Sequence, residues 1–188
     1  MNKPTYVKAF LLVIIFIVIA GSPVLAQDIF DLAAEGNPDE VREAINEGEE
    51  VNAKMRYDWT PLMLAASENE NPRVLEILIE AGADVNARDI HDTTVLMNAV
   101  NSNENPDVIK KLLKAEADVD AQDRSGRSVL MIAAEESNNL EIIELLLEYG
   151  ADTELTDDNN RTVFDYADKN EYIESAKIIQ LLEKSQTN

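Results

Sequence analysis

The chain offers little for nucleophilic or metal-assisted catalysis, because it has almost no histidine and no cysteine. Catalysis generally needs a nucleophile with a base, a metal cluster or a phosphate-binding loop. The sequence holds a single histidine, His91, no cysteine and no glycine-rich phosphate loop. We therefore expect a protein that is not an enzyme. We expect His91 to be an exposed turn residue, with a contact to a partner as the alternative.

One acidic stretch, residues 118–123, looks like the start of a calcium-binding loop. An EF-hand loop needs glycine at its sixth position and glutamate at its twelfth. Those two positions hold Asp123 and Val129 here. The absence of cysteine also removes thiolate metal sites and disulfides. We therefore expect no metal and no cofactor.

The chain is strongly acidic, with 37 aspartates and glutamates, 16 lysines and arginines, and a formal net charge of −21. Removal of residues 1–26, which contain two lysines and no acid, would leave 14 basic residues and a net charge of −23. The electrostatic field of a chain with this net negative charge repels nucleic acid and anionic membranes, so we expect neither as a partner. Most acids are expected to line solvated faces, and an acidic surface suited to a basic partner is the alternative.

The N-terminal segment, from Met1 to Ala26, has the order of a secretory signal peptide. Lys3 and Lys8 form a basic start, residues 9–20 are uniformly apolar, and residues 21–23 (Gly-Ser-Pro) break that run. We predict cleavage after Ala26 and a secreted or periplasmic protein without membrane association afterwards. The alternative is that the segment is retained as a membrane anchor.

The rest of the chain is organised by an internal repeat. Similar tetrapeptides begin at Thr60, Thr94, Ser128 and Thr162, so each begins 34 residues after the one before it. A second phrase, of the form Gly-Ala-Asp-Val-Asn-Ala, recurs at residues 82–87, 116–121 and 150–152. A constant period of this length indicates stacked copies of one supersecondary unit, each too small to bury its own apolar face. Such a stack presents a surface, which favours binding over catalysis.

Each unit contains its own start and stop residues. First helices are expected to begin at N-cap residues, which are Thr60, Thr94, Ser128 and Thr162. Second helices are expected to begin at Asn-Pro pairs, which are Asn37-Pro38, Asn71-Pro72 and Asn105-Pro106. Glycines that can adopt a left-handed conformation end them, at Gly48, Gly82 and Gly150. An extended finger follows, and its turn uses residues that tolerate positive φ: Asp58, Asp92, Gly126 and Asn160.

This unit resembles the ankyrin repeat, whose consensus contains Thr-Pro-Leu-His and Gly-Ala-Asp-Val-Asn-Ala. The resemblance implies an all-α ankyrin-repeat solenoid over residues 27–188, built from helix-turn-helix units joined by β-hairpin-like fingers. The expected copies are an N-terminal cap repeat (28–54), three full repeats (55–88, 89–122 and 123–156) and a C-terminal cap repeat (157–188).

Two departures from the family pattern matter for the structure. The family's histidine is replaced by Met63, Met97, Met131 and Asp165. We expect the methionines to fill gaps between repeats, because Met adapts to irregular cavities. Glu116 stands where the family has glycine, so we expect the second helix of that repeat to have either a strained end, with positive φ, or an altered one.

In the ankyrin family, partners usually contact the concave surface formed by the finger tips and the first helices. The resemblance implies that the residues in contact with a partner are Arg56, Tyr57, Trp59, Ile90, His91, Thr93, Arg124, Ser125, Arg127 and Arg161. We expect Tyr57 and Trp59 to form an apolar anchor, with the arginines pairing with acids of the partner. The alternative is that the arginines pair with carboxylates of this chain and that Trp59 packs on the next finger.

The sequence thus predicts an exported adaptor or scaffold that binds a protein of unknown identity and is itself a monomer. The alternative function is an inhibitor or immunity-type protein that blocks a secreted or envelope enzyme. An enzyme on a repeat scaffold is the remaining class, and the missing catalytic residues argue against it.

Overall fold

The computed structural model describes residues 28–69, 71–103 and 105–186. The predicted signal peptide, residues 1–26, lies outside these ranges, so its export function stays a prediction. Within the described ranges, no helix is both long enough and apolar enough to cross a membrane.

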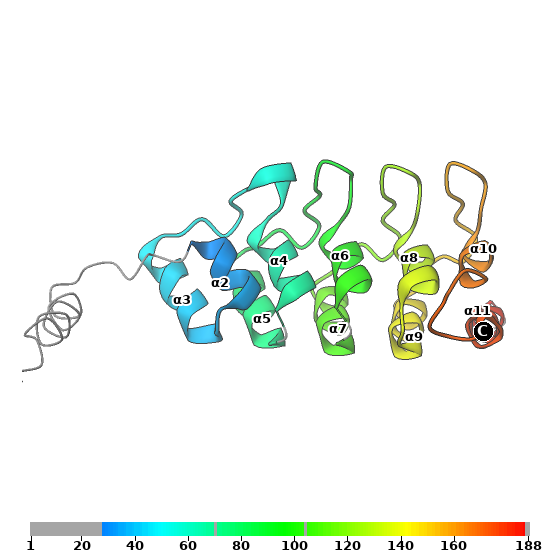
Figure 1. Ribbon diagram of the computed structural model, residues 1–188. Helices are drawn as coiled ribbons and strands as arrows, with labels where there is room; N and C mark the ends of the chain where they lie inside the picture. Colours follow the sequence, from blue (N-terminus) through cyan, green and yellow to red (C-terminus); the bar gives the residue numbers. More distant parts are fainter. Residues whose placement is uncertain (1–27, 70, 104, 187–188) are drawn as a thin grey trace, which may run out of the picture.

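The described residues form two rows of helices with fingers projecting along one side (Figure 1). The row beside the fingers contains α2 (Ile29–Glu35), α4 (Pro61–Glu68), α6 (Val95–Ser102), α8 (Val129–Glu136) and α10 (Val163–Ala167). The second row contains α3 (Pro38–Glu47), α5 (Pro72–Glu80), α7 (Pro106–Lys114), α9 (Leu140–Glu148) and α11 (Ser175–Ser185). Each helix contacts its neighbours in the same row and its partner in the other row.

The fingers contain little regular structure. The first carries a short 3₁₀ helix, η1 (Arg56–Asp58). The second and third each carry one isolated β-bridge, joining Arg88 to Thr94 and Gln122 to Ser128. No strand longer than a bridge occurs in the part of the chain that the structure describes. The predicted all-α solenoid of helix-turn-helix units is therefore confirmed.

Helix ends lie at the predicted capping residues. The hydroxyls of Thr60, Thr94 and Ser128 accept backbone N–H groups three residues later at 3.2–3.3 Å. Asn side chains cap the second helices, at Asn37, Asn71 and Asn105, and each accepts the backbone N–H group two residues later. Thr162 is also an N-cap, but its backbone N–H and its hydroxyl both donate to Asp165 Oδ2. These bonds satisfy polar groups that a helix terminus leaves unpaired.

Positive φ occurs at every predicted turn position. The φ angles of Asp58, Asp92, Gly126 and Asn160 lie between 58° and 76°. Glu116 has a φ of 65°, which confirms the strain expected from its place in the repeat. Tyr57 has a φ of 65° as well, which was not expected and which makes the first finger different from the others.

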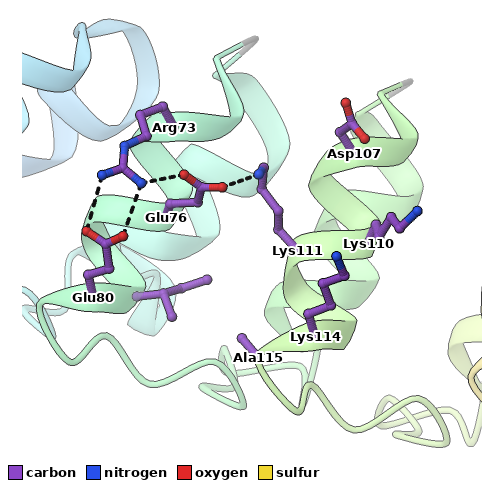
Figure 2. Close-up of a pocket in the computed structure, with 9 residues that line it drawn as sticks. Arg73, Glu76, Glu80, Asp107, Lys110, Lys111, Lys114 and Ala115 are labelled. Atoms are coloured by element: carbon purple, nitrogen blue, oxygen red, sulfur yellow. Dashed lines mark hydrogen bonds and ion pairs between the residues drawn. The ribbon is translucent and has the colours of Figure 1, made fainter.

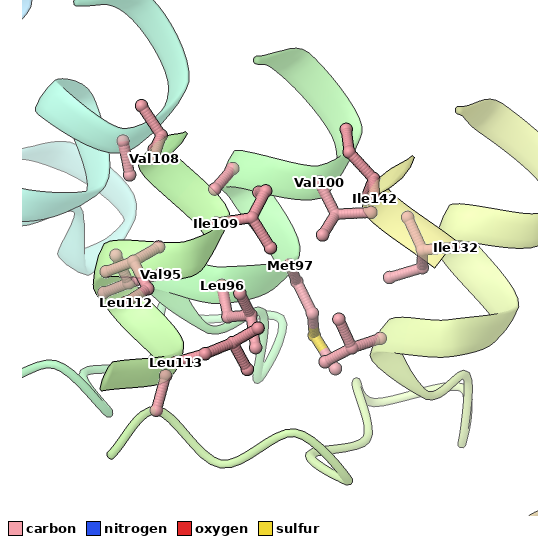
Figure 3. Packing of buried hydrophobic residues seen from close by; sticks show 14 of the residues in the cluster. Val95, Leu96, Met97, Val100, Val108, Ile109, Leu112, Leu113, Ile132 and Ile142 are labelled. Carbon is pink, nitrogen blue, oxygen red and sulfur yellow. The ribbon is translucent and has the colours of Figure 1, made fainter. Parts of the chain in front are cut away.

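The core runs continuously through the stack, and Figure 3 shows the part of it around α6 and α7. Met63, Met97 and Met131 are at most 1% exposed, which confirms their role as packing residues between repeats. The sulfur atoms of Met97 and Met131 also accept hydrogen bonds. Met97 Sδ lies 3.5 Å from the Thr94 backbone nitrogen, and Met131 Sδ lies 3.4 Å from that of Ser128. The thioether thus pairs weakly with the backbone of the helix N-cap.

One buried polar group in this core lacks a hydrogen bond. Asn98 on α6 is 9% exposed, and its Nδ2 atom has no partner within the described part of the protein. The equivalent positions of the two neighbouring repeats are the apolar Leu64 and Ile132. A buried amide without a partner lowers stability, so Asn98 is a local weakness of the second full repeat.

Candidate partner-binding surface

The second, third and fourth fingers share an internal brace that the sequence analysis missed. Asp89 Oδ1 accepts the backbone N–H groups of His91 and Thr93 at 2.8 and 2.9 Å. The same two bonds recur at Asp123 and Asp157, with lengths of 2.8–3.0 Å. The three aspartates recur with the same period as the helix N-caps. This regular spacing is the sequence signal from which the brace could have been predicted. In each of these fingers, the aspartate carboxylate holds the turn closed.

Backbone hydrogen bonds join each finger tip to the next. The Ile90 nitrogen donates to the Tyr57 carbonyl at 3.1 Å, the Arg124 nitrogen to the His91 carbonyl at 3.0 Å, and the Asp158 nitrogen to the Ser125 carbonyl at 3.1 Å. The four fingers therefore act as one connected edge (Figure 1). A surface ordered in this way loses little conformational entropy when it binds a partner.

The first finger departs from this pattern. Met55 occupies the position of the bracing aspartate, and both Tyr57 and Asp58 adopt positive φ. A salt bridge of 3.5 Å between Lys54 and Asp58 spans the turn. The Arg56 guanidinium lies over the Tyr57 ring, 4.7 Å from its centroid. Backbone strain of this kind is often found at functional sites.

Exposed apolar side chains concentrate on the first two fingers. Met55 is 44% exposed, Tyr57 49% and Ile90 37%, and these are three of the four large apolar residues that are exposed in the described ranges. The fourth, Tyr172, is 67% exposed and follows α10 at the other end of the stack. The hydrogen bond between Ile90 and Tyr57 places the side chains of the two tips on adjoining segments. We call Met55, Tyr57 and Ile90 the apolar tip.

The remaining candidate residues lie beside this tip or along the same edge. Trp59 is half-buried and packs against the core, so it supports the finger more than it faces solvent. His91 is exposed, as expected, and Thr93 is half-buried. Ser125 is exposed on the third finger. The structure therefore brings the candidates to one edge of the stack, and their role in binding stays a prediction.

The candidate arginines differ in whether this chain already pairs them. Arg127 Nε lies 3.0 Å from Asp123 Oδ2, and Arg161 lies 2.6 Å from Asp157 Oδ2. Arg124 forms a longer, exposed pair of 3.5 Å with Asp92. Arg56 forms no ion pair with any residue in the described ranges, and its partner is the Tyr57 ring.

The last finger holds the tightest polar cluster of the surface. Tyr166 Oη donates to Asp157 Oδ2 and accepts from Arg161, both at 2.8 Å. Burial alone would raise the pKa of Asp157, but hydrogen bonds from Arg161, Tyr166 and the Asn159 backbone outweigh it and hold that pKa far below its usual range. Burial and the nearby Asp157 carboxylate raise the pKa of Tyr166 to about 12. The cluster is a satisfied structural network, so Arg161 has little freedom to meet a partner's acid.

The described residues include no group of three or more histidines, aspartates or glutamates placed to hold a metal ion.

Comparison with known proteins gives the family. A family model described as ankyrin repeats, in three copies, matches residues 96–188. A second model, for a single ankyrin repeat, matches residues 57–90. The chain belongs to the ankyrin repeat family. A search of curated proteins found no match. Ankyrin repeats indicate a protein–protein interaction module, and proteins built from them are typically non-enzymatic.

Proposed function

We propose that this ankyrin repeat protein binds a protein partner through the finger edge, with the apolar tip as the centre of the contact. The observation that carries the proposal is that three of the four exposed large apolar side chains in the described ranges, Met55, Tyr57 and Ile90, lie on two neighbouring fingers. Exposed apolar patches on a soluble protein mark interaction sites.

The residue types around the tip favour binding as well. Tyrosine and arginine are enriched among the residues that dominate binding energy at interfaces. Arg56 is stacked on Tyr57 and has no acid of this chain beside it in the described ranges, so its charge is available to a partner. Arg124, on the third finger, has only an exposed pair with Asp92. We therefore assign Arg56 and Arg124 to acids of the partner, and Arg127 and Arg161 to the internal framework.

The test compares a tip variant with a matched control. The full chain serves as bait in a chemical crosslinking pull-down from its native source, beside Tyr57→Ala/Ile90→Ala and beside Tyr172→Ala. Because truncation of two central contact residues removes much of an interface's binding energy, we expect the tip variant to lose at least about tenfold in affinity for the captured protein. The Tyr172→Ala control, which removes a more exposed side chain at the other end of the stack, should bind normally. Equal binding by all three baits would refute the placement, provided that circular dichroism shows the variants folded.

We also propose that the chain is exported as a monomer without enzymatic activity. The basic start, the apolar run and the break before Ala26 support export. Mass spectrometry of the protein recovered from its source should then give a mature N-terminus at Gln27. A mass that still contains residues 1–26 would favour a retained anchor.

A further inference from the structure

A groove lies on the helices of the second row, away from the fingers. It has a volume of about 540 Å³ and runs between α5 and α7 (Figure 2). Charged side chains line most of it, and Ile79 and Ala115 contribute apolar surface. The lining includes four of the chain's 16 basic residues: Arg73, Lys110, Lys111 and Lys114.

At two positions, the charge of α7 is opposite to that of both its neighbours in the stack. Lys110 occupies the repeat position that holds Glu76 on α5 and Glu144 on α9. Lys114 occupies the position of Glu80 and Glu148. The repeat therefore places glutamates along this face, and α7 interrupts them with lysines.

Two of the four basic residues are engaged within the groove. Arg73 pairs with Glu76 at 2.6 Å and with Glu80 at 3.0 Å, and Lys111 also pairs with Glu76 (Figure 2). These bonds raise the pKa of Arg73 and lower that of Glu76. Both glutamates of the groove are thus neutralised by this chain, and Asp107 is the remaining acid of its lining.

Lys110 and Lys114 form no ion pair with any residue that the structure describes, although the chain has 37 acidic residues. They lie one helical turn apart on the same side of α7, and residues at this spacing have Cβ atoms about 6 Å apart. Alternate side chains of an extended peptide lie on one face at a spacing of about 7 Å. Two carboxylates of an extended acidic peptide therefore match the two free lysines.

We propose that the groove between α5 and α7 is a second docking site, and that its occupant is an acidic, extended segment of a protein partner. Charge complementarity supports this occupant, because Lys110 and Lys114 outnumber Asp107, the one acid of the lining that forms no ion pair with a described residue. The net negative charge of the chain does not prevent such binding at physiological ionic strength, where charges more than about 8 Å away are largely screened. The site is distinct from the apolar tip and does not rest on it.

The test uses an oligoglutamate peptide of about ten residues, which in extended form is long enough to cross both helices. Binding of the fluorescently labelled peptide to the full chain is followed by anisotropy. Because each exposed ion pair contributes modestly, we expect Lys110→Gln/Lys114→Gln to weaken binding by about fivefold. The matched control is Lys54→Gln/Lys177→Gln, which removes the same charge from positions outside the groove and should leave affinity unchanged. Lys110→Arg/Lys114→Arg should retain binding.

Several results would overturn the proposal. They are absence of peptide binding to the unmodified chain, an equal loss of affinity in the groove variant and the control, and binding of inorganic tripolyphosphate without binding of the peptide. The tip variant Tyr57→Ala/Ile90→Ala should bind the peptide normally, so failure of the finger proposal and failure of this one are separable. A lower thermal midpoint in the groove variant with unchanged peptide affinity would show that the two lysines serve only the stability of α7.

Discussion

Replacing Glu116 by glycine is expected to stabilise the protein. Glu116 follows the end of α7 and has a φ of 65°, in the left-handed region that side chains with a Cβ atom disfavour. Its backbone carbonyl accepts a hydrogen bond from Asn86 at 3.2 Å, and glycine would keep that bond. The equivalent residues in neighbouring repeats, Gly82 and Gly150, already are glycines with φ near 90°.

The size of the effect follows from two opposing contributions. The left-handed conformation costs a residue other than glycine about 1–2 kcal/mol of conformational free energy. Glycine makes the unfolded chain more flexible, and the extra conformational entropy lost on folding offsets about 0.5–1 kcal/mol of the stability gained by removing the strain. The net increase in the free energy of unfolding is therefore about 0.5–1 kcal/mol. For a domain of this size, such an increase corresponds to a rise of about 1–4 °C in the thermal midpoint.

The reciprocal variant provides the control. An added Cβ atom at Gly82 would meet no heavy atom within 4 Å, so Gly82→Ala changes backbone strain without a steric clash. We expect Gly82→Ala to lower the free energy of unfolding by about 1 kcal/mol, measured by urea denaturation with Glu116→Gly in parallel. A decrease in stability for Glu116→Gly, or no change for Gly82→Ala, would show that positive φ is not what distinguishes these positions.

Two further predictions concern buried polar groups. Asn98→Leu, which installs the side chain found at Leu64, should raise the free energy of unfolding by about 1–2 kcal/mol because it removes an unpaired buried amide; a lower urea midpoint would mean that Asn98 has a partner in solution. Asp157→Asn should destabilise the protein near neutral pH, because the folded state lowers the pKa of Asp157. Stabilisation of this kind is present above the unfolded pKa of about 4 and is lost as pH falls below it, so the difference in midpoint between wild type and variant should shrink in acid. A difference that is independent of pH would contradict this assignment.

Local features that depend on one residue and its repeat position could be predicted from the sequence. The N-caps at Thr60 and Ser128, the positive φ of Asn160 and the strain at Glu116 all follow from residue type and the constant period of the repeat. These features involve contacts within a few residues of each other, where backbone preferences determine the outcome. The period itself then determines that the units stack.

Features that depend on how side chains meet across a finger or between helices could not be read in the same way. The sequence left open whether the arginines pair with this chain or with a partner, and the structure pairs Arg127 and Arg161 with the aspartates of their own fingers. The pairing of Lys111 with Glu76 depends on the spacing of α5 and α7. The exposure of Met55 and the half-burial of Trp59 depend on the turn geometry of the first finger, which residue types alone did not show.

The central claim is that the apolar tip contacts a protein partner, and site-specific photocrosslinking tests it most directly. A photoreactive phenylalanine derivative is incorporated at Tyr57 or, as the control, at Tyr172, and the full chain is irradiated in its native setting. We predict a discrete crosslinked product of higher mass from position 57 and none from position 172, because only the first side chain lies on the proposed contact surface. Products of equal yield from both positions, or a product from position 172 alone, would contradict the claim.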